Sequence, residues 1–266
     1  GFQETEDALA ALRILAKEAR IQDEAVRAAR ESVRIATNQY EAGTLNYLNV
    51  VVAQSAALNA ERAAIDRLKA YRDRARINVC HVSCAESLAA LKGSGMTYEA
   101  TPHHMLLDSS MDLGAWGKVN PPLRRRADRE ALFQAFCRGE VPMLATDHAP
   151  HAPEEKERDF GEAPSGLPGV ETGFAMMLAL VKRGFLSLDV LLMAACSNPA
   201  TTFGLNKGLI AEGRDADLVV VDPREITPIK GRELHSKCGW TPYEGKEAMF
   251  PQAVFLGGKL VLKDGS

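Results

Sequence analysis

The sequence lacks the marks of a secreted, membrane-spanning or nucleic-acid-binding protein. Its five cysteines are an odd number without a framework of pairs, which favours a reducing compartment. No run approaches the roughly 20 apolar residues of a membrane-spanning helix, and the acidic first residues are not a secretory signal. Lysine and arginine total 32 against 35 aspartate and glutamate, which leaves no basic field for a phosphate backbone. We therefore expect a cytoplasmic globular protein that binds no nucleic acid, with a chain that begins inside something larger.

The first 76 residues differ in composition from the rest. They contain no proline, histidine or cysteine, and they hold 18 alanines and only two glycines. Apolar or small residues recur at helical spacing on both sides of Gly43, which lies in the only break. This pattern predicts two long helices joined by a short turn, an antiparallel hairpin over residues 1–65.

Four strings of the hairpin follow one another in a specific order. They are Ala28-Ala29-Arg30-Glu31-Ser32, Asn38-Gln39-Tyr40-Glu41-Ala42-Gly43-Thr44, Tyr47-Leu48-Asn49-Val50 and Ala53-Gln54. In this order residues 1–60 resemble one repeat of the outer-membrane efflux channel (TolC-like) family. A generic alanine-rich hairpin is the alternative. Without membrane strands such a segment would make no pore, because backbone polar groups in lipid must be paired internally.

Strand-like and helix-like runs alternate from about residue 66. Short β-rich runs over 76–82 and 141–147, with helical runs over 85–91, 129–136 and 173–181, argue for parallel βα units. Two later strand-like runs, 217–222 and 253–261, indicate a small β element. We expect an α/β fold in which residues 66–215 form a partial (β/α)8 barrel and residues 216–266 form the β element.

Three side chains that can bind a metal close strand-like runs in this region: His81, His103 and Asp147. In a βα barrel the carboxyl ends of the strands converge on one face, so these residues can reach a common point. Imidazole and carboxylate suit zinc, which lowers the pKa of a bound water enough for attack on an amide. A neighbouring carboxylate can carry the proton to the leaving nitrogen. The pattern favours metal-assisted hydrolysis.

Each of these residues has a simpler explanation when it is taken alone. A histidine at a strand end is more often a hydrogen-bonded structural residue, and Asp147 is equally well explained as a helix cap. Cys80 and Cys84 lie on either side of His81 and allow a cysteine–histidine metal site. The lack of a second cysteine pair with zinc spacing argues against that alternative.

The strings around these residues also occur in a specific order. They are Cys80-His81-Val82-Ser83, Thr101-Pro102-His103-His104, Lys118-Val119-Asn120-Pro121-Pro122-Leu123-Arg124, Ala145-Thr146-Asp147-His148-Ala149-Pro150-His151, Pro164-Ser165-Gly166-Leu167-Pro168-Gly169-Val170-Glu171-Thr172, Asn198-Pro199-Ala200, Gly213-Arg214-Asp215-Ala216-Asp217-Leu218 and Trp240-Thr241-Pro242-Tyr243-Glu244-Gly245. In this order residues 66–266 resemble the C-terminal half of a dihydroorotase of the amidohydrolase superfamily. The strings Asn120-Pro121-Pro122-Leu123-Arg124 and Thr146-Asp147-His148-Ala149-Pro150-His151 favour dihydroorotase over allantoinase and dihydropyrimidinase.

The resemblance implies a role for each matching residue. His81 and His103 would be zinc ligands, and Asp147 would be both a metal ligand and the proton carrier. The substrate would be held by Asn120, His151 and the backbone of Ser165 and Gly166. His104 and His148 would orient their neighbours. Arg124 would either contact the substrate or form a salt bridge, and the structural role is favoured slightly. The implied reaction is the reversible closure of N-carbamoyl-aspartate to dihydroorotate in pyrimidine biosynthesis.

The other metal ligands of the family have no counterpart in the sequence. A dihydroorotase carries a His-x-His pair on its first strand and a bridging carboxylate from a later one. Here the earliest histidine is His81, and the only lysines before it are Lys17 and Lys69. About four strands of eight would remain, with open edges that a homo-oligomer could cover. We therefore expect a junction of two unrelated sequences between about Leu58 and Arg76, as a natural fusion, a mis-assembled gene or a deliberate joining.

Three functional hypotheses follow. The first is a dihydroorotase-like, zinc-dependent cyclic amidohydrolase whose small-molecule substrate is dihydroorotate or N-carbamoyl-aspartate, with its activity put in question by the missing ligands. The second is a catalytically inactive amidohydrolase homologue, or a chimeric fragment. The third is a fragment of an outer-membrane efflux channel.

Overall fold

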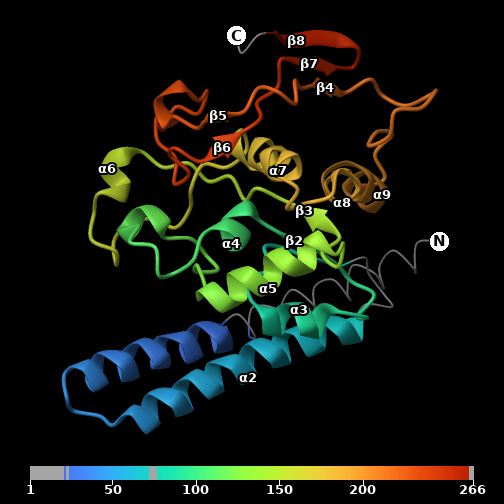
Figure 1. The fold of residues 1–266 in the computed structure, drawn as a ribbon. Coiled ribbons are helices and arrows are strands. Elements are labelled where there is room, and N and C mark those ends of the chain that lie inside the picture. Colours follow the sequence, from blue (N-terminus) through green and yellow to red (C-terminus); the bar gives the residue numbers. More distant parts are fainter. Residues whose placement is uncertain (1–20, 22–23, 72–76, 264–266) are drawn as a thin grey trace, which may run out of the picture. The chain divides into compact units, whose positions relative to one another are not determined.

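The computed structural model describes residues 21, 24–71 and 77–263, and Figure 1 shows their ribbon. The chain divides into two compact units, Gly1–Ile77 and Asn78–Ser266. The expected domain limits at residues 65 and 215 stay predictions.

The described part of the first unit is helical. Residues 24–41 form one helix and α2 spans Tyr47–Tyr71, as alanine-rich sequence favours. Gly43 lies between them at a φ of +71°, a left-handed conformation that suits glycine. The side chains of Arg30 and Glu61 form an ion pair at 2.9 Å, which joins one helix to the other.

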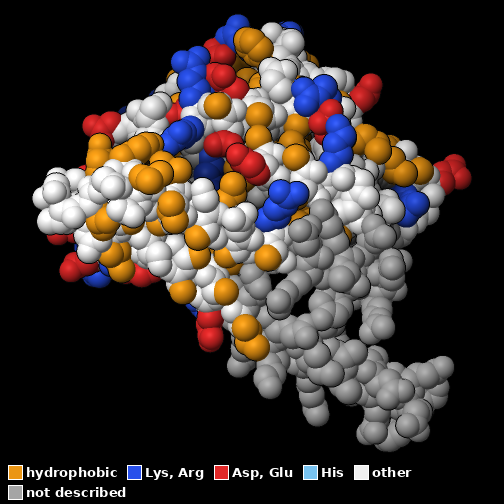
Figure 2. Space-filling model, turned by 90° about the horizontal axis from the view of Figure 1, so that it is seen from below, with side chains coloured by type: hydrophobic (Ala, Val, Ile, Leu, Met, Phe, Trp, Pro, Cys, Tyr) orange, Lys and Arg blue, Asp and Glu red, His pale blue; other side chains and the backbone are white. Residues whose placement is uncertain are grey.

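The surface of these helices is mixed in character. Leu48 and Val52 of α2 are exposed, while Arg34 and Glu31 form an exposed ion pair on the preceding helix. The face of the molecule drawn in Figure 2 likewise has hydrophobic side chains beside charged ones. Over the described ranges, no helix combines the length and the apolar character needed to cross a bilayer.

The second unit begins with a parallel sheet of three short strands. These are β1 (Asn78–Val79), β2 (Thr97–Ala100) and β3 (Met143–Leu144), in the order β1-β2-β3. Both pairings are parallel. The helix α3 (Ala85–Leu91) connects β1 to β2, and α4 (Pro102–Leu106) and α5 (Arg126–Cys137) lie between β2 and β3. This confirms the expected βα units, although the described residues give this sheet three strands instead of about four.

Further helices follow in the second unit. They are the 3₁₀ turn η1 (Gly114–Gly117), α6 (Pro153–Lys156), α7 (Thr172–Lys182), α8 (Leu188–Leu192), the π-helical turn η2 (Met193–Ser197) and α9 (Asn198–Phe203). The helix α7 is buried over most of its length, which explains its nearly continuous apolar sequence. Met176 of α7 belongs to a core cluster with Leu167, Ile229 and Tyr243.

The last part of the second unit contains the expected β element. The strands β4 (Leu218–Val220), β7 (Ala253–Leu256) and β8 (Lys259–Lys263) form an antiparallel sheet in the order β4-β7-β8. A two-residue turn, Gly257 and Gly258, joins β7 to β8, and both residues have the positive φ that such a turn requires. The strands β5 (Thr227–Pro228) and β6 (Glu247–Ala248) form a separate pair, and η3 (Gly231–Glu233) follows β5.

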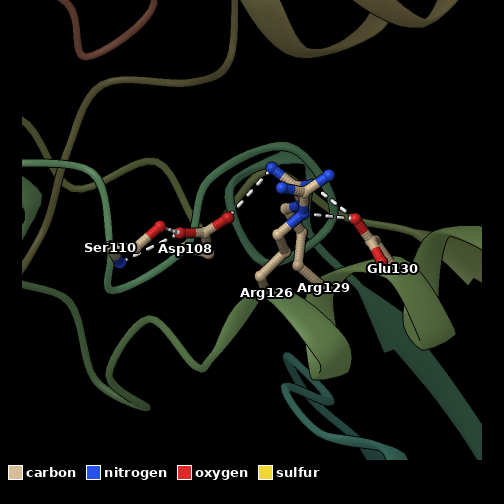
Figure 3. A network of polar contacts seen from close by, with 5 residues as sticks. All are labelled: Asp108, Ser110, Arg126, Arg129 and Glu130. Atoms are coloured by element: carbon tan, nitrogen blue, oxygen red, sulfur yellow. Dashed lines mark hydrogen bonds and ion pairs between the residues drawn. The ribbon is translucent and has the colours of Figure 1, made fainter.

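A polar network fixes the start of α5 against the loop that follows α4 (Figure 3). Asp108, whose side chain is 2% exposed, pairs with Arg129 at 2.9 Å and accepts hydrogen bonds from the N–H and hydroxyl of Ser110. The Ser110 hydroxyl and, to a smaller extent, Arg129 hold the pKa of Asp108 below its ordinary value. Arg126 and Arg129 both contact Glu130 on the exposed side.

Candidate functional site

The three candidate metal ligands follow three neighbouring parallel strands. His81 lies two residues after β1, His103 three residues after β2 and Asp147 three residues after β3. The backbone pairing continues past the strands, since the N–H of Val82 donates to Glu99 O and that of Ala145 to Ala100 O. Because the strands are parallel and adjacent, all three residues lie toward the same edge of the sheet.

Two of these residues have an unusual backbone. His81 has a φ of 43° and Asp147 a φ of 48°, and they are the non-glycine residues with positive φ in the described part of the chain. This conformation costs a residue with a Cβ about 1–2 kcal/mol. Strain of this kind concentrates at functional sites, where the surrounding fold holds a side chain in a required direction.

The third residue, His103, belongs to a helix rather than to the end of a strand. Thr101 caps α4 by accepting from the N–H of His104, and Pro102 occupies the first helical position, where its missing N–H does no harm. Both signals were present in the sequence, and they end the strand at Ala100. His103 therefore faces inward from the first turn of α4 and is fully buried.

Three buried imidazole nitrogens of His81 and His103 have no hydrogen-bond partner. Neither ring nitrogen of His103 has one, and Nδ1 of His81 has none either. Buried polar atoms are normally paired, so orphaned nitrogens call for a missing partner. Burial, with smaller effects of His104 and His81, lowers the pKa of His103 to about 2. The ring is therefore neutral at physiological pH, which is the form that binds metals.

Two imidazoles thus suit a metal ion, but a full ligand set is not assembled. No group of three or more His, Cys, Asp and Glu side chains in the described residues is arranged to hold one. Asp147 is exposed. Burial raises the pKa of the Cys80 thiol, and the negative charge of the nearby Asp147 adds a smaller rise. The role of Asp147 as a third ligand stays a prediction.

The alternatives to a metal site are not supported by local geometry. Asp147 caps no helix, because the next one, α6, begins at Pro153. The Sγ atom of Cys84 lies 3.1 Å from Ser87 Oγ, and Cys80 and Cys84 are both free thiols. The cysteine–histidine site is therefore not formed.

The segments that carry the predicted substrate residues meet in a second group of loops. Nε2 of His151 lies 3.2 Å from the carbonyl oxygen of Ser165. The N–H of Gly166 donates to Lys118 O at 2.9 Å, which joins this loop to the segment that carries Asn120. The side chains of Asn120 and Ser165 are exposed, and that of His151 is 26% exposed. A small molecule could therefore reach all three.

Gly166 has no room for a side chain. Its φ is +140°, and an added Cβ would lie 2.7 Å from both Cβ and O of Ala149 and 3.0 Å from Nε2 of His151. The Gly166 N–H that was expected to hold the substrate is bonded to Lys118 O within the protein. Its use by a substrate stays a prediction.

The expected orienting residues make specific contacts. His104 bridges the hydroxyl of Thr101, at 2.8 Å, and the carbonyl of Pro121, at 3.0 Å. Nδ1 of His148 accepts from the N–H of Gly169 at 3.0 Å. Nε of Arg124 donates to Ser83 Oγ at 3.1 Å, next to the strand end that carries His81. These contacts hold the loops around the candidate site.

Sequence reasoning missed two residues of the site. Lys156 is fully buried, although its neighbours Glu154, Glu155 and Glu157 are typical of an exposed helix. Trp240 was noted only as part of a string, and its Nε1–H donates to the carbonyl of His151 at 2.8 Å. The residues next to Lys156 and Trp240 in the sequence indicate neither the burial of the lysine nor the hydrogen bond of the tryptophan, because both depend on segments that the fold brings together.

The chain is similar to known proteins over most of its length. Residues 8–261 match the model of the amidohydrolase family. A dihydroorotase of Halobacterium salinarum is 46% identical over 207 residues, which are 76% of this chain and 49% of that protein. A dihydroorotase of Methanosarcina acetivorans is 37% identical over 255 residues, which are 89% of this chain and 54% of that protein. The chain therefore spans about half the length of the curated relatives it matches.

Solved structures give the same picture of the fold. A D-hydantoinase (dihydropyrimidinase) from Thermus sp. has a TM-score of 0.76 and 27% identity, and the match covers 89% of this chain and 56% of that one. An L-hydantoinase from Arthrobacter aurescens gives the same values. The likeness fits an α/β fold of the TIM-barrel type.

The comparisons do not support two of the expectations. The family match begins at residue 8 and so extends into the helical segment, and nothing in these comparisons supports an efflux-channel repeat there. They give no support to a junction of unrelated sequences either. The chain belongs to the amidohydrolase family.

Proposed function

We propose that this chain is part of a dihydroorotase-like, zinc-dependent cyclic amidohydrolase that interconverts dihydroorotate and N-carbamoyl-aspartate. The observation that carries the proposal is the placement of His81, His103 and Asp147 after three adjacent parallel strands. The orphaned imidazole nitrogens of the two histidines add to it. Dihydroorotases at 46% and 37% identity support the choice of substrate, because the hydantoinase structures are less similar, at 27%.

His81 and His103 would hold the zinc ion. Both rings offer nitrogens that the protein leaves unpartnered, and the low pKa of His103 keeps that ring ready to bind without first losing a proton. When bound, zinc polarises the amide carbonyl and lowers the pKa of water in the site.

Asp147 would carry the proton. Its carboxylate is exposed at the end of β3, where a water and a bound ring can both reach it. It takes a proton from water as the new C–O bond forms and returns it to the ring nitrogen as the C–N bond breaks. In ring closure the same proton moves in the opposite direction.

The second group of loops would bind the substrate. Dihydroorotate carries a carboxylate, which requires hydrogen-bond donors. The amide of Asn120 and the imidazole of His151 are donors near the surface, and Ser165 lies beside His151. These residues would orient the ring so that its amide carbon faces the metal ligands.

A catalytically inactive homologue is the second candidate. The observation that favours it is the lack of a three-ligand group in the part of the chain that the structure describes. Such a protein would bind zinc or dihydroorotate without turning the substrate over.

The test measures hydrolysis of dihydroorotate at saturating zinc by the parent protein, by Asp147→Asn and by the control Asp189→Asn, which changes an exposed aspartate of α8. We expect the parent and the control to be equally active, and Asp147→Asn to be slower by about 10²–10⁴-fold, the usual worth of a general acid–base group. Equal rates for all three proteins would refute the role of Asp147. Binding of dihydroorotate by an inactive parent would establish the second candidate.

A further inference from the structure

One lysine is buried beside the substrate loops without a carboxylate partner among the described residues. The Nζ atom of Lys156 donates to three backbone carbonyls: Gly166 O at 2.9 Å, Pro164 O at 3.0 Å and Lys118 O at 3.3 Å. An ammonium group has three donors, so its hydrogen-bonding capacity is filled.

This arrangement is costly to build. Taking an ammonium group out of water is strongly unfavourable unless polar partners replace the water. Burial, with a smaller effect of Lys118, lowers the pKa of Lys156. The three carbonyl dipoles are what compensates, so the ammonium and the loops that supply the carbonyls hold each other in place.

The three carbonyls belong to segments that carry predicted substrate residues. Lys118 O lies two residues before Asn120, and the carbonyls of Pro164 and Gly166 flank Ser165.

A further contact links the ammonium to His151. Nζ of Lys156 lies 5.8 Å from the centroid of the Trp240 ring, and Trp240 in turn donates to the carbonyl of His151. Lys156 therefore lies where the segments bearing Asn120, Ser165 and His151 meet.

We propose that Lys156 is a positioning residue of the substrate site, whose ammonium ties these three segments together so that Asn120, Ser165 and His151 face one carboxylate-bearing ligand. The proposal rests on the proposed function for the identity of the ligand. The tying of the loops does not depend on it.

The test uses Lys156→Met, which keeps the length of the side chain and removes its charge and donors, with Lys182→Met, an exposed lysine of α7, as the matched control. Three quantities are measured: the zinc dissociation constant by chelator competition, the dihydroorotate dissociation constant by equilibrium dialysis, and hydrogen exchange of the Gly166 amide, which donates to Lys118 O. We expect Lys156→Met to weaken dihydroorotate binding and to speed this exchange by about tenfold or more each, as the loss of a charged hydrogen bond predicts. Zinc binding should stay unchanged, and Lys182→Met should match the parent throughout.

Lys156→Arg keeps a charge and donors, and it should restore part of both losses. This variant decides the question if Lys156→Met does not fold. The proposal would be overturned if the Gly166 amide exchanged as slowly in Lys156→Met as in the parent. It would also be overturned if Lys156→Met and Lys156→Arg weakened dihydroorotate binding and sped this exchange to the same extent. If the parent itself fails to bind dihydroorotate, the proposed function is wrong, and exchange at Gly166 alone then decides whether Lys156 positions the loop.

Discussion

Replacement of Gly166 by alanine should damage both stability and the substrate loop. The added Cβ would lie 2.7 Å from Cβ and O of Ala149, and 3.0 Å from Nε2 of His151. Distances under 3.0 Å are not sustained by real Cβ atoms, so the chain at Ala149 or the loop at Gly166 has to move. The imidazole of His151 would be pushed from its position 3.2 Å from Ser165 O.

The loss in the free energy of unfolding expected for Gly166→Ala has two parts. A φ of +140° lies outside the left-handed helical region and costs an alanine about 1–3 kcal/mol. About 0.4–1 kcal/mol of this cost is offset, because alanine also reduces the conformational entropy of the unfolded chain. The overpacked contacts with backbone and side chain add about 1–3 kcal/mol. We expect Gly166→Ala to lower the free energy of unfolding by about 3 kcal/mol.

Gly184→Ala is the matched control. Gly184 also has a positive φ, +79°, but nothing lies within 4 Å of its added Cβ. Urea unfolding of both variants should therefore place Gly184→Ala about 1 kcal/mol below the parent, and Gly166→Ala about 2 kcal/mol lower still. Equal losses in the two variants would show that the close contacts around Gly166 cost nothing, and would refute the reasoning.

Three further predictions concern stability. Asp108→Asn should lower the free energy of unfolding by about 2–3 kcal/mol, because it removes the buried counter-charge of Arg129 and leaves only the more exposed contact with Glu130. In the metal-free protein the folded pKa of His103 is about 2 and lies below the unfolded value of about 6.5, so the unfolded state gains the proton first as the pH falls. The contribution of His103 to stability should therefore be complete well above pH 6.5 and reduced by about 2 kcal/mol at pH 5. Burial also lowers the pKa of His104, to about 4, which adds a loss of its own, so the pH profile of His103→Leu should be flatter but not flat. Trp240→Phe removes the hydrogen bond to His151 O and should cost about 1 kcal/mol in urea unfolding.

The first two of these predictions have a contrary outcome that can be measured. Asp112→Asn alters an exposed aspartate and should leave stability unchanged, so an equal effect of Asp108→Asn would contradict the importance of the network in Figure 3. A profile that stays steep in His103→Leu would assign the acid sensitivity to other groups.

Local sequence signals predicted much of the fold of the second unit. The run over 85–91 became α3 with the same limits, because its alanine and leucine residues favour a helix and need no distant partner. The run over 141–147 became a strand of two residues, Met143–Leu144. Strand limits depend on which residues find a partner in the neighbouring strand, and that information is not local.

The candidate site was predictable only in part. The motifs identified His81, His103 and Asp147, and the strand order places them toward one edge of the sheet. The sequence did not reveal that these residues fall short of a three-ligand group among the described residues. It also gave no sign that Lys156 is buried, because its three carbonyl partners come from segments that only the tertiary fold brings together.

The central claim is that His81 and His103 form a metal site, and zinc affinity tests it most directly. The zinc dissociation constant of the metal-free protein should be measured by chelator competition for the parent, His81→Ala, His103→Ala and the control His235→Ala. The account predicts that each of the first two substitutions weakens zinc binding at least about 100-fold, because a ligand is lost, and that His235→Ala binds like the parent. Parent-like affinity in both His81→Ala and His103→Ala would contradict it.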